Sequence, residues 1–188
     1  MNYPNGSKKK FEDVVTYANR GMGLEEDLNV TNEYYLENDV AVIHKKPTPI
    51  VIYKVDYPSR KEAIIREAKF KIPSTTDYNG IYKGKYLDFE AKETNNKTNF
   101  PISNIHEHQL NHLRNIIAHG GIGFLIVRFT SFNKTYFLSG ENLFHFLDTE
   151  KRKSIPIEFF EKHGILIPIG LRPRLNYLNA IEVDNEKY

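Results

Sequence analysis

Apolar and polar side chains alternate along residues 85–92, which read KYLDFEAK. Alternation of this kind predicts a β-strand, because successive side chains of a strand point to opposite faces of its sheet. Every second residue from Leu87 onwards is apolar, and the residues between them are Asp88, Glu90 and Lys92. The apolar face is typical of a strand that packs on a core. The charged face is either solvent-exposed surface or part of a functional site.

Two amphipathic stripes predict helices on either side of this strand. A stripe at i, i+4, i+7 and i+11 from Leu24 predicts a helix over residues 24–38. Glu25 lies in its first turn, where the helix dipole favours negative charge, so a structural role and a catalytic role both remain open. A second stripe predicts a helix over about residues 104–119. Gln109 lies on its apolar side, where an amide is costly to bury without a partner.

Shorter patterns predict the rest of a single domain. Strands are expected at residues 40–44, 50–57, 124–129, 134–138 and 165–169, and short helices at 141–148 and 156–162. Residues 63–71 fit either a strand or a short helix, and residues 172–178 are expected to close the ordered part. Residues 1–18 are polar and aperiodic, which predicts a flexible arm ahead of one domain at 19–188.

The composition fits a globular domain rather than a membrane or secreted protein. The chain of 188 residues is 40% hydrophobic and 27% charged, enough apolar surface for one core. No apolar run reaches the roughly 20 residues of a membrane span. The absence of cysteine excludes thiolate metal sites and suits a reducing cytoplasm.

Positive charge gathers in residues 44–71. Eight Lys or Arg against three acidic residues give a local charge of +5, although the whole chain carries only +2. Pro47 and Pro49 exclude a helix interior there. Aromatic residues, including Tyr53 and Phe70, are interleaved with the charges. The segment is therefore either a solvated hairpin or a surface that neutralises phosphates and stacks bases.

The charged face of residues 85–92 also fits metal-dependent phosphodiester hydrolysis. Asp77 lies 13 residues before Glu90 and next to Asn79–Gly80, a strong turn signal. Two carboxylates on adjacent strands repel each other, and a divalent cation such as Mg²⁺ or Mn²⁺ offsets that cost. Lys92 would stand beside the cation and stabilise negative charge on phosphorus. Because an E-x-K triplet is a weak signal by itself, the residues alone leave a nuclease open.

Two other motifs fit catalytic sites less well. His108 and His112 have the i, i+4 spacing of a metal pair, but no third ligand is evident, and a polar network is the simpler interpretation. The glycines of residues 120–123 precede a predicted strand rather than opening a helix, which argues against a phosphate-binding loop.

The run at residues 74–94, STTDYNGIYKGKYLDFEAKET, closely resembles the RecU Holliday-junction resolvases of bacteria. The resemblance extends from Asn19 to Leu178. Its other matching segments are residues 19–22, 41–49, 57–60 and 173–175. It implies a restriction-endonuclease-like α/β fold: a mixed central sheet flanked by helices, with a protruding stalk. It also implies a homodimer in which each active site cuts one of two opposed strands of a four-way junction.

The resemblance implies a role for each residue of the site. Asp77 and Glu90 would be metal carboxylates, and Thr75 would help to complete the Mg²⁺ shell. Gln109 would be a further ligand or would position water. Lys92 would stabilise the transition state. Asp88 shares the face, and whether it contacts the metal or only neighbouring lysines remains open.

The resemblance also implies how DNA and proteins are bound. Residues 44–71 correspond to the stalk that reaches the junction, with Lys45, Lys46, Arg60 and Phe70 as candidate DNA contacts. Expected partners are the strand-exchange recombinase and a branch-migration helicase. The arm before Asn19 is shorter than is usual for the family, so the resemblance implies no function for it.

We therefore expect a Mg²⁺-dependent endonuclease, with Mn²⁺ as a substitute, that resolves Holliday junctions during recombination and DNA repair. Paired nicks in opposed strands would leave 5′-phosphates. One alternative is a non-catalytic DNA-binding or strand-annealing recombination module. Another is a restriction-type nuclease that cuts linear duplex.

Overall fold

The computed structural model describes residues 23–59, 61–71 and 75–186 of the chain. The expected arm at residues 1–18 and the expected DNA contact Arg60 lie outside these ranges. Among the described residues, no helix is both long and apolar enough to cross a membrane.

A six-stranded mixed sheet forms the centre of the molecule, in the order β1-β4-β5-β7-β8-β10. Its strands are β1 (Val42–Lys45), β4 (Tyr78–Tyr82), β5 (Lys85–Thr94), β7 (Ile122–Phe129), β8 (Lys134–Ser139) and β10 (Ile165–Ile167). β5 and β7 are parallel, and the other neighbours are antiparallel. The parallel pair needs a crossover, which α2 (Glu107–Ala118) supplies. The predicted mixed α/β fold is confirmed.

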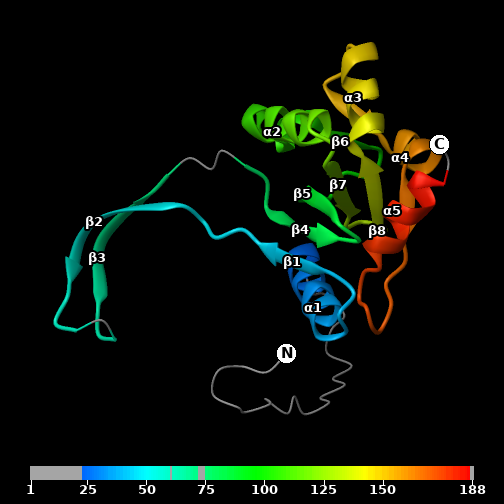
Figure 1. Cartoon of the computed structure of the whole chain (residues 1–188). Helices are drawn as coiled ribbons and strands as arrows, with labels where there is room; N and C mark the ends of the chain where they lie inside the picture. The colour runs from blue at the N-terminus through cyan, green and yellow to red at the C-terminus, as the bar shows by residue number, and fades with distance from the viewer. Residues whose placement is uncertain (1–22, 60, 72–74, 187–188) are drawn as a thin grey trace.

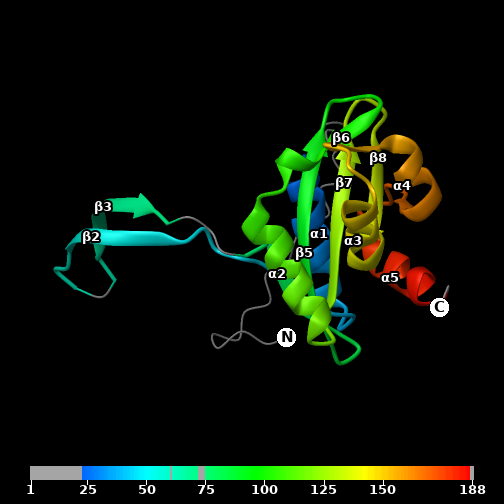
Figure 2. The ribbon, with the colours of Figure 1, turned by 90° about the horizontal axis from the view of Figure 1, so that it is seen from above.

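Helices cover both faces of this sheet (Figure 2). α1 (Leu24–Glu37) and α5 (Tyr177–Asn185) enclose one core together with Phe89 and Phe124. α2, α3 (Gly140–Thr149) and α4 (Ile157–His163) contribute to a second core around Leu125 and Leu138. A short 3₁₀ helix, η1 (Ile102–Asn104), and a two-stranded sheet of β6 (Asn99–Pro101) and β9 (Ser154–Pro156) complete the body. Of the central strands, β7 and β8 contribute side chains to both cores.

Several predicted boundaries differ from the structure. The stripe of the first helix is confirmed, because Leu24, Leu28, Thr31 and Tyr35 are all buried. The second helix begins at Glu107 rather than at about residue 104, since η1 occupies residues 102–104. The prediction that residues 172–178 close the ordered part is wrong. α5 begins within this segment at Tyr177, continues to Asn185, and buries Leu178 and Ile181.

The turn between β4 and β5 is not the predicted one. Asn79–Gly80 lies inside β4, and the chain reverses at Lys83–Gly84, where both residues have positive φ (47° and 75°). Two such residues match the twist of a two-residue hairpin. Gly80 is needed for another reason, because a Cβ there would lie 2.2 Å from the main-chain oxygen of Val42 in β1. The Asn-Gly signal thus marks a close strand approach.

β1 is an edge strand rather than the buried strand expected at residues 40–44. Only Ile43 of its four residues is buried, and Val42 is 46% exposed. Its single sheet neighbour is β4, so one of its edges has no partner strand among the described residues.

The segment expected to form a stalk is a separate two-stranded hairpin of β2 (Ile50–Asp56) and β3 (Ile64–Phe70). The helical alternative for residues 63–71 is wrong. Figure 1 shows the hairpin extending away from the body. Thirteen of its fourteen strand residues are exposed, and the remaining one, Asp56, is half-buried. The hairpin therefore receives no packing support from the described body.

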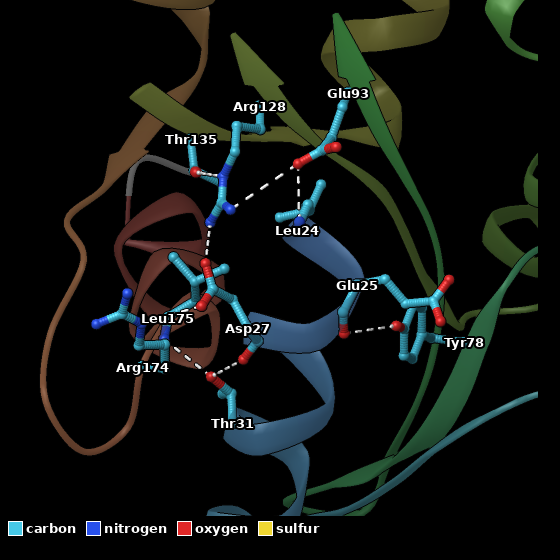
Figure 3. Close-up of polar contacts among 10 residues, drawn as sticks. All are labelled: Leu24, Glu25, Asp27, Thr31, Tyr78, Glu93, Arg128, Thr135, Arg174 and Leu175. Atoms are coloured by element: carbon cyan, nitrogen blue, oxygen red, sulfur yellow. Dashed lines mark hydrogen bonds and ion pairs between the residues drawn. The ribbon is translucent and has the colours of Figure 1, made fainter. Parts of the chain in front are cut away.

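A buried charge cluster fastens α1 to the sheet (Figure 3). Nη2 of Arg128, on β7, lies 2.6 Å from Oδ2 of Asp27, and both side chains are at most 4% exposed. Nε of Arg174 donates to the other oxygen of Asp27 at 2.9 Å. Nε of Arg128 donates to Thr135 on β8 at 3.0 Å. The cluster thus joins α1, β7, β8 and the segment before α5.

We predict that Arg128→Met lowers the free energy of unfolding by about 3–5 kcal/mol, because Asp27 would remain buried without its main cation. Urea denaturation at neutral pH measures the loss. Lys134→Met is the matched control, since Lys134 forms an exposed pair with Glu161 that contributes little. Equal denaturation midpoints for the two variants would contradict the buried role of Arg128.

Candidate active site

The candidate active site lies where β4 and β5 diverge. Their ladder ends at the pair Tyr78–Phe89, whereas β5 continues to Thr94 beside β7 alone. The residue before β4 therefore lies at the open edge of β5. That residue is Asp77, and its main-chain N–H donates to Oε2 of Glu90 at 3.1 Å. The two carboxylates predicted to act together are adjacent.

A cleft of about 250 Å³ opens beside this edge of β5. Its lining includes Asp77, Lys92 and Glu93 together with Glu25 from the first turn of α1. The main-chain N–H of Leu24 donates to Oε1 of Glu93 at 2.8 Å, which holds the start of α1 at the cleft. Glu25 forms an exposed ion pair with Lys45. Glu25 is thus near the predicted catalytic residues as well as in a helix first turn.

Glu90 is the electrostatically most perturbed acid of the site. Its side chain is 0% exposed. Burial, then a hydrogen bond with the Asp77 carboxyl group and the charge of Asp77, raise its pKa from 4.5 to about 8, and Lys92 acts in the opposite direction. Nζ of Lys92 lies 2.5 Å from Oε1 of Glu90. Apart from this ion pair, Oε1 is buried without a hydrogen-bond partner among the described residues.

These features fit a divalent cation. Paired carboxylates with an incompletely satisfied buried oxygen are the donors that Mg²⁺ and Mn²⁺ prefer. No group of three or more His, Asp or Glu side chains within the described ranges is arranged to hold a metal ion. A cation here would therefore need neutral oxygen donors in addition to Asp77 and Glu90.

Asp88, on the same face of β5, lies in a different environment. Its side chain is 0% exposed, and four groups converge on it. Two groups donate to Oδ2 of Asp88: Nζ of Lys46 at 2.7 Å and the hydroxyl of Tyr86 at 3.0 Å. Nε2 of His112 lies 3.2 Å from the same oxygen. The hydroxyl of Thr76 donates to Oδ1. The contact between His112 and Asp88 agrees with the polar-network interpretation of that histidine.

The remaining predicted site residues lie around this centre. Gln109 is buried, and its Oε1 accepts a hydrogen bond from the main-chain N–H of His106 at 2.9 Å at the start of α2. Thr75 is half-buried two residues before Asp77. Phe70, at the end of β3, is 84% exposed. The structure thus gives Gln109 a capping contact that its position on the apolar stripe did not reveal.

Sequence reasoning missed Thr76, Tyr86 and the inward direction of Lys46. Tyr86 precedes Asp88 by two residues on a strand, so their shared face was a usable signal. The contact of Thr76 with Asp88 spans 12 residues and that of Lys46 spans 42, and no local pattern encodes either.

The fold and site define an α/β protein with two carboxylates and a lysine at a strand edge. The family model described as "RecU: Recombination protein U" matches residues 19–183, and the chain belongs to this family.

Two relatives extend the match. "Holliday junction resolvase RecU" of Bacillus cytotoxicus is 50% identical over 196 residues, covering 97% of each chain. The protein of the same name from Geobacillus sp. is 56% identical over 169 residues, covering 88% of this chain and 84% of its own. Among solved structures, the chain is similar to Hjc of Archaeoglobus fulgidus, a Holliday junction resolvase. That match has a TM-score of 0.42 at 10% identity, covering 74% of this chain and 94% of that one, and carries no further conclusion.

We predict that Glu90→Gln changes how stability depends on pH in EDTA. The pKa of Glu90 is about 8 in the folded protein, against 4.5 for an ordinary glutamate in the unfolded chain. Between pH 4.5 and pH 8, Glu90 is therefore protonated in the folded state and ionised in the unfolded state. The wild type should therefore lose stability relative to the variant as pH rises from 4.5 to 8, by a few kcal/mol at most, and no further above pH 8.

Urea denaturation at pH 5 and pH 8 measures this difference, with Glu161→Gln as an exposed control that should leave the profile unchanged. Parallel profiles for wild type and Glu90→Gln would contradict the raised pKa.

Proposed function

We propose that this chain is a Mg²⁺-dependent endonuclease that resolves Holliday junctions by paired nicks in opposed strands during recombination and DNA repair. The observation that carries the proposal is the meeting of Asp77, Glu90 and Lys92 at the open edge of β5, beside a cleft. The names of the curated relatives, which are Holliday junction resolvases, support the choice of substrate.

Asp77 and Glu90 would hold the cation, and the hydroxyl of Thr75 and the side-chain oxygen of Gln109 would be its neutral donors. The buried Oε1 of Glu90 and the raised pKa of that carboxyl support this, because a cation offsets the cost of two adjacent negative charges. When bound, the ion would polarise the scissile phosphate and neutralise developing charge. Mn²⁺ would substitute because it accepts the same oxygen ligands.

Lys92 would stabilise the transition state. Its ammonium is paired with Glu90, and Lys92 lines the cleft in which the scissile phosphate would lie. Attack by water adds negative charge to the phosphoryl oxygens, and a fixed ammonium stabilises that charge more than the ground state. Breakage of the bond between phosphorus and the 3′ oxygen then leaves a 5′-phosphate and a 3′-hydroxyl.

The hairpin of β2 and β3 would be the stalk that contacts the junction. Lys54 and Lys69 are exposed on its two strands, and Nζ of Lys69 lies 5.3 Å from the ring centre of Tyr53. Phe70 is exposed enough to stack on a base. Lys45 and Arg60 are further candidates on the resemblance alone.

A homodimer would place two active sites on opposed strands. Its support is the stalk, where Ile50, Ile52, Val55 and Ile64 are each at least 40% exposed. A lone two-stranded hairpin is marginally stable, and exposed apolar surface of this kind favours packing against another molecule. A strand-exchange recombinase and a branch-migration helicase as partners rest on the resemblance alone.

We predict that Lys92→Met and Asp77→Asn each lower the rate of junction cleavage in Mg²⁺ by about 100-fold or more, because each removes a charge that acts on the reacting phosphate. Binding of the same synthetic junction in EDTA should stay near that of the wild type. Single-turnover cleavage and gel-shift titration measure the two quantities.

The alternatives give different results in the same assays. Equal loss of binding in both variants would indicate a DNA-binding or annealing surface rather than a catalytic site. Equal cutting of a linear duplex and a junction would indicate a restriction-type nuclease.

We predict that Lys54→Ala and Lys69→Ala each weaken junction binding and reduce the slope of log affinity against log salt by about 1, since each removes one phosphate contact. Binding titrations in EDTA at several salt concentrations measure the slope. Lys134→Ala, on the body, should leave it unchanged. An unaltered slope in both stalk variants would show that the stalk lysines do not contact phosphates.

A further inference from the structure

Lys46 and Asp88 have no part in the chemistry described above, yet both are directed into the protein beside the site. Lys46 lies between β1 and the first stalk strand, and Asp88 lies on β5 two residues before Glu90. The geometry points to a positioning role for both residues: with Thr76 and His112 they form a clamp that holds Asp77 against β5. This inference deepens the proposed function and rests on it.

Lys46 holds Asp77 through two independent routes. Its main-chain N–H donates to the main-chain oxygen of Asp77 at 2.7 Å. Its Nζ donates to the hydroxyl of Thr76, the residue before Asp77, at 2.9 Å. The same Nζ donates to Oδ2 of Asp88 at 2.7 Å, so the clamp ends on the strand that carries Glu90. Lys46 thus fixes Asp77, in the segment before β4, relative to β5 and its Glu90.

Burial separates Lys46 from a DNA-contacting lysine. The Lys46 side chain is 17% exposed, and its partner Asp88 is 0% exposed. The neighbouring Lys45 side chain is 41% exposed, and its partner Glu25 is 62% exposed. A phosphate would have to draw the Lys46 ammonium away from a buried carboxylate, which would then lie uncompensated. Lys46 is therefore held by a buried partner, whereas the partner of Lys45 is exposed.

The clamp also reaches α2. Nε2 of His112 lies 3.2 Å from Oδ2 of Asp88, and Gln109 lies one turn earlier on the same helix. The helix that would supply a neutral metal donor is thus tied to the strand that supplies Glu90. Asp88 joins the loop, the strand and the helix, the three segments that carry the proposed ligands.

The position of the clamp links the site to the stalk. Lys46 lies just before the chain enters the stalk at β2, and Thr76 lies after it leaves at β3. Both segments at the base of the stalk are therefore held to β5 by Asp88. Asp77 lies between the stalk and β4, and without this contact only its main-chain hydrogen bonds and the adjoining strand β4 would hold it.

The experiment measures Mn²⁺ binding to the whole protein without DNA, by electron paramagnetic resonance of free Mn²⁺. Lys46→Met and Asp88→Asn should each weaken Mn²⁺ binding by about 10- to 100-fold, the usual effect of losing a group that orients a metal ligand. Lys46→Arg should recover most of the affinity. The double variant should lose less than the product of the single losses, because both residues serve one contact.

Junction assays separate positioning from DNA contact. In EDTA, Lys46→Met should bind the junction with the wild-type affinity and the wild-type salt slope. In Mg²⁺, it should lower kcat at an unchanged KM for the junction. Circular dichroism checks folding, and Thr76→Val tests the same contact should Lys46→Met be unfolded.

Three results would overturn the inference. A weaker junction affinity with a smaller salt slope in Lys46→Met would make Lys46 a DNA contact. Loss of Mn²⁺ binding in Asp88→Asn as complete as in Asp77→Asn would make Asp88 a ligand. Unchanged Mn²⁺ affinity in all clamp variants would leave no positioning role. If the wild type binds Mn²⁺ but cuts no junction, the proposed function fails, while the Mn²⁺ measurements still test the clamp.

Discussion

The burial of two acids on one face of β5 is the constraint on which the site depends. Asp88 and Glu90 are each 0% exposed, and an ionised carboxylate is costly to bury without compensation. The protein surrounds Asp88 with an ammonium, two hydroxyls and an imidazole. In the described ranges, Glu90 contacts Lys92 and Asp77, and its pKa is raised. Asp88 is balanced internally, whereas Glu90, beside Asp77, keeps its proton at neutral pH, and a bound cation would offset the cost of ionising it.

On the opposite face of the sheet, a buried carboxylate is balanced by an ion pair. Arg128 and Asp27 are both buried there, and their ion pair holds α1 against β7. Glu93, the residue after Lys92, accepts the first main-chain N–H of α1. Because side chains alternate along β5, the strand holds the proposed reaction centre on one face and the helix that borders the cleft on the other.

Local patterns predicted the faces of β5 correctly because strand periodicity needs no distant contact. The resemblance carried by residues 74–94 named Asp77, Glu90 and Lys92, which the structure brings together. The Asn-Gly signal failed because a glycine has two uses. At Gly80 the absence of a side chain allows β1 to approach β4. The Asn-Gly dipeptide alone does not distinguish such a close approach from a turn.

The sequence by itself determined a mixed α/β domain, a basic segment set apart from it, and a strand with one charged face. All three follow from periodicity and composition, which are short-range properties of the chain. Only the tertiary structure decided that this face is buried, that Lys46 turns inward, and that Asp88 and Glu90 have different surroundings. The physical reason is distance along the chain: the partners of Asp88 include Lys46, 42 residues earlier, and His112, 24 residues later.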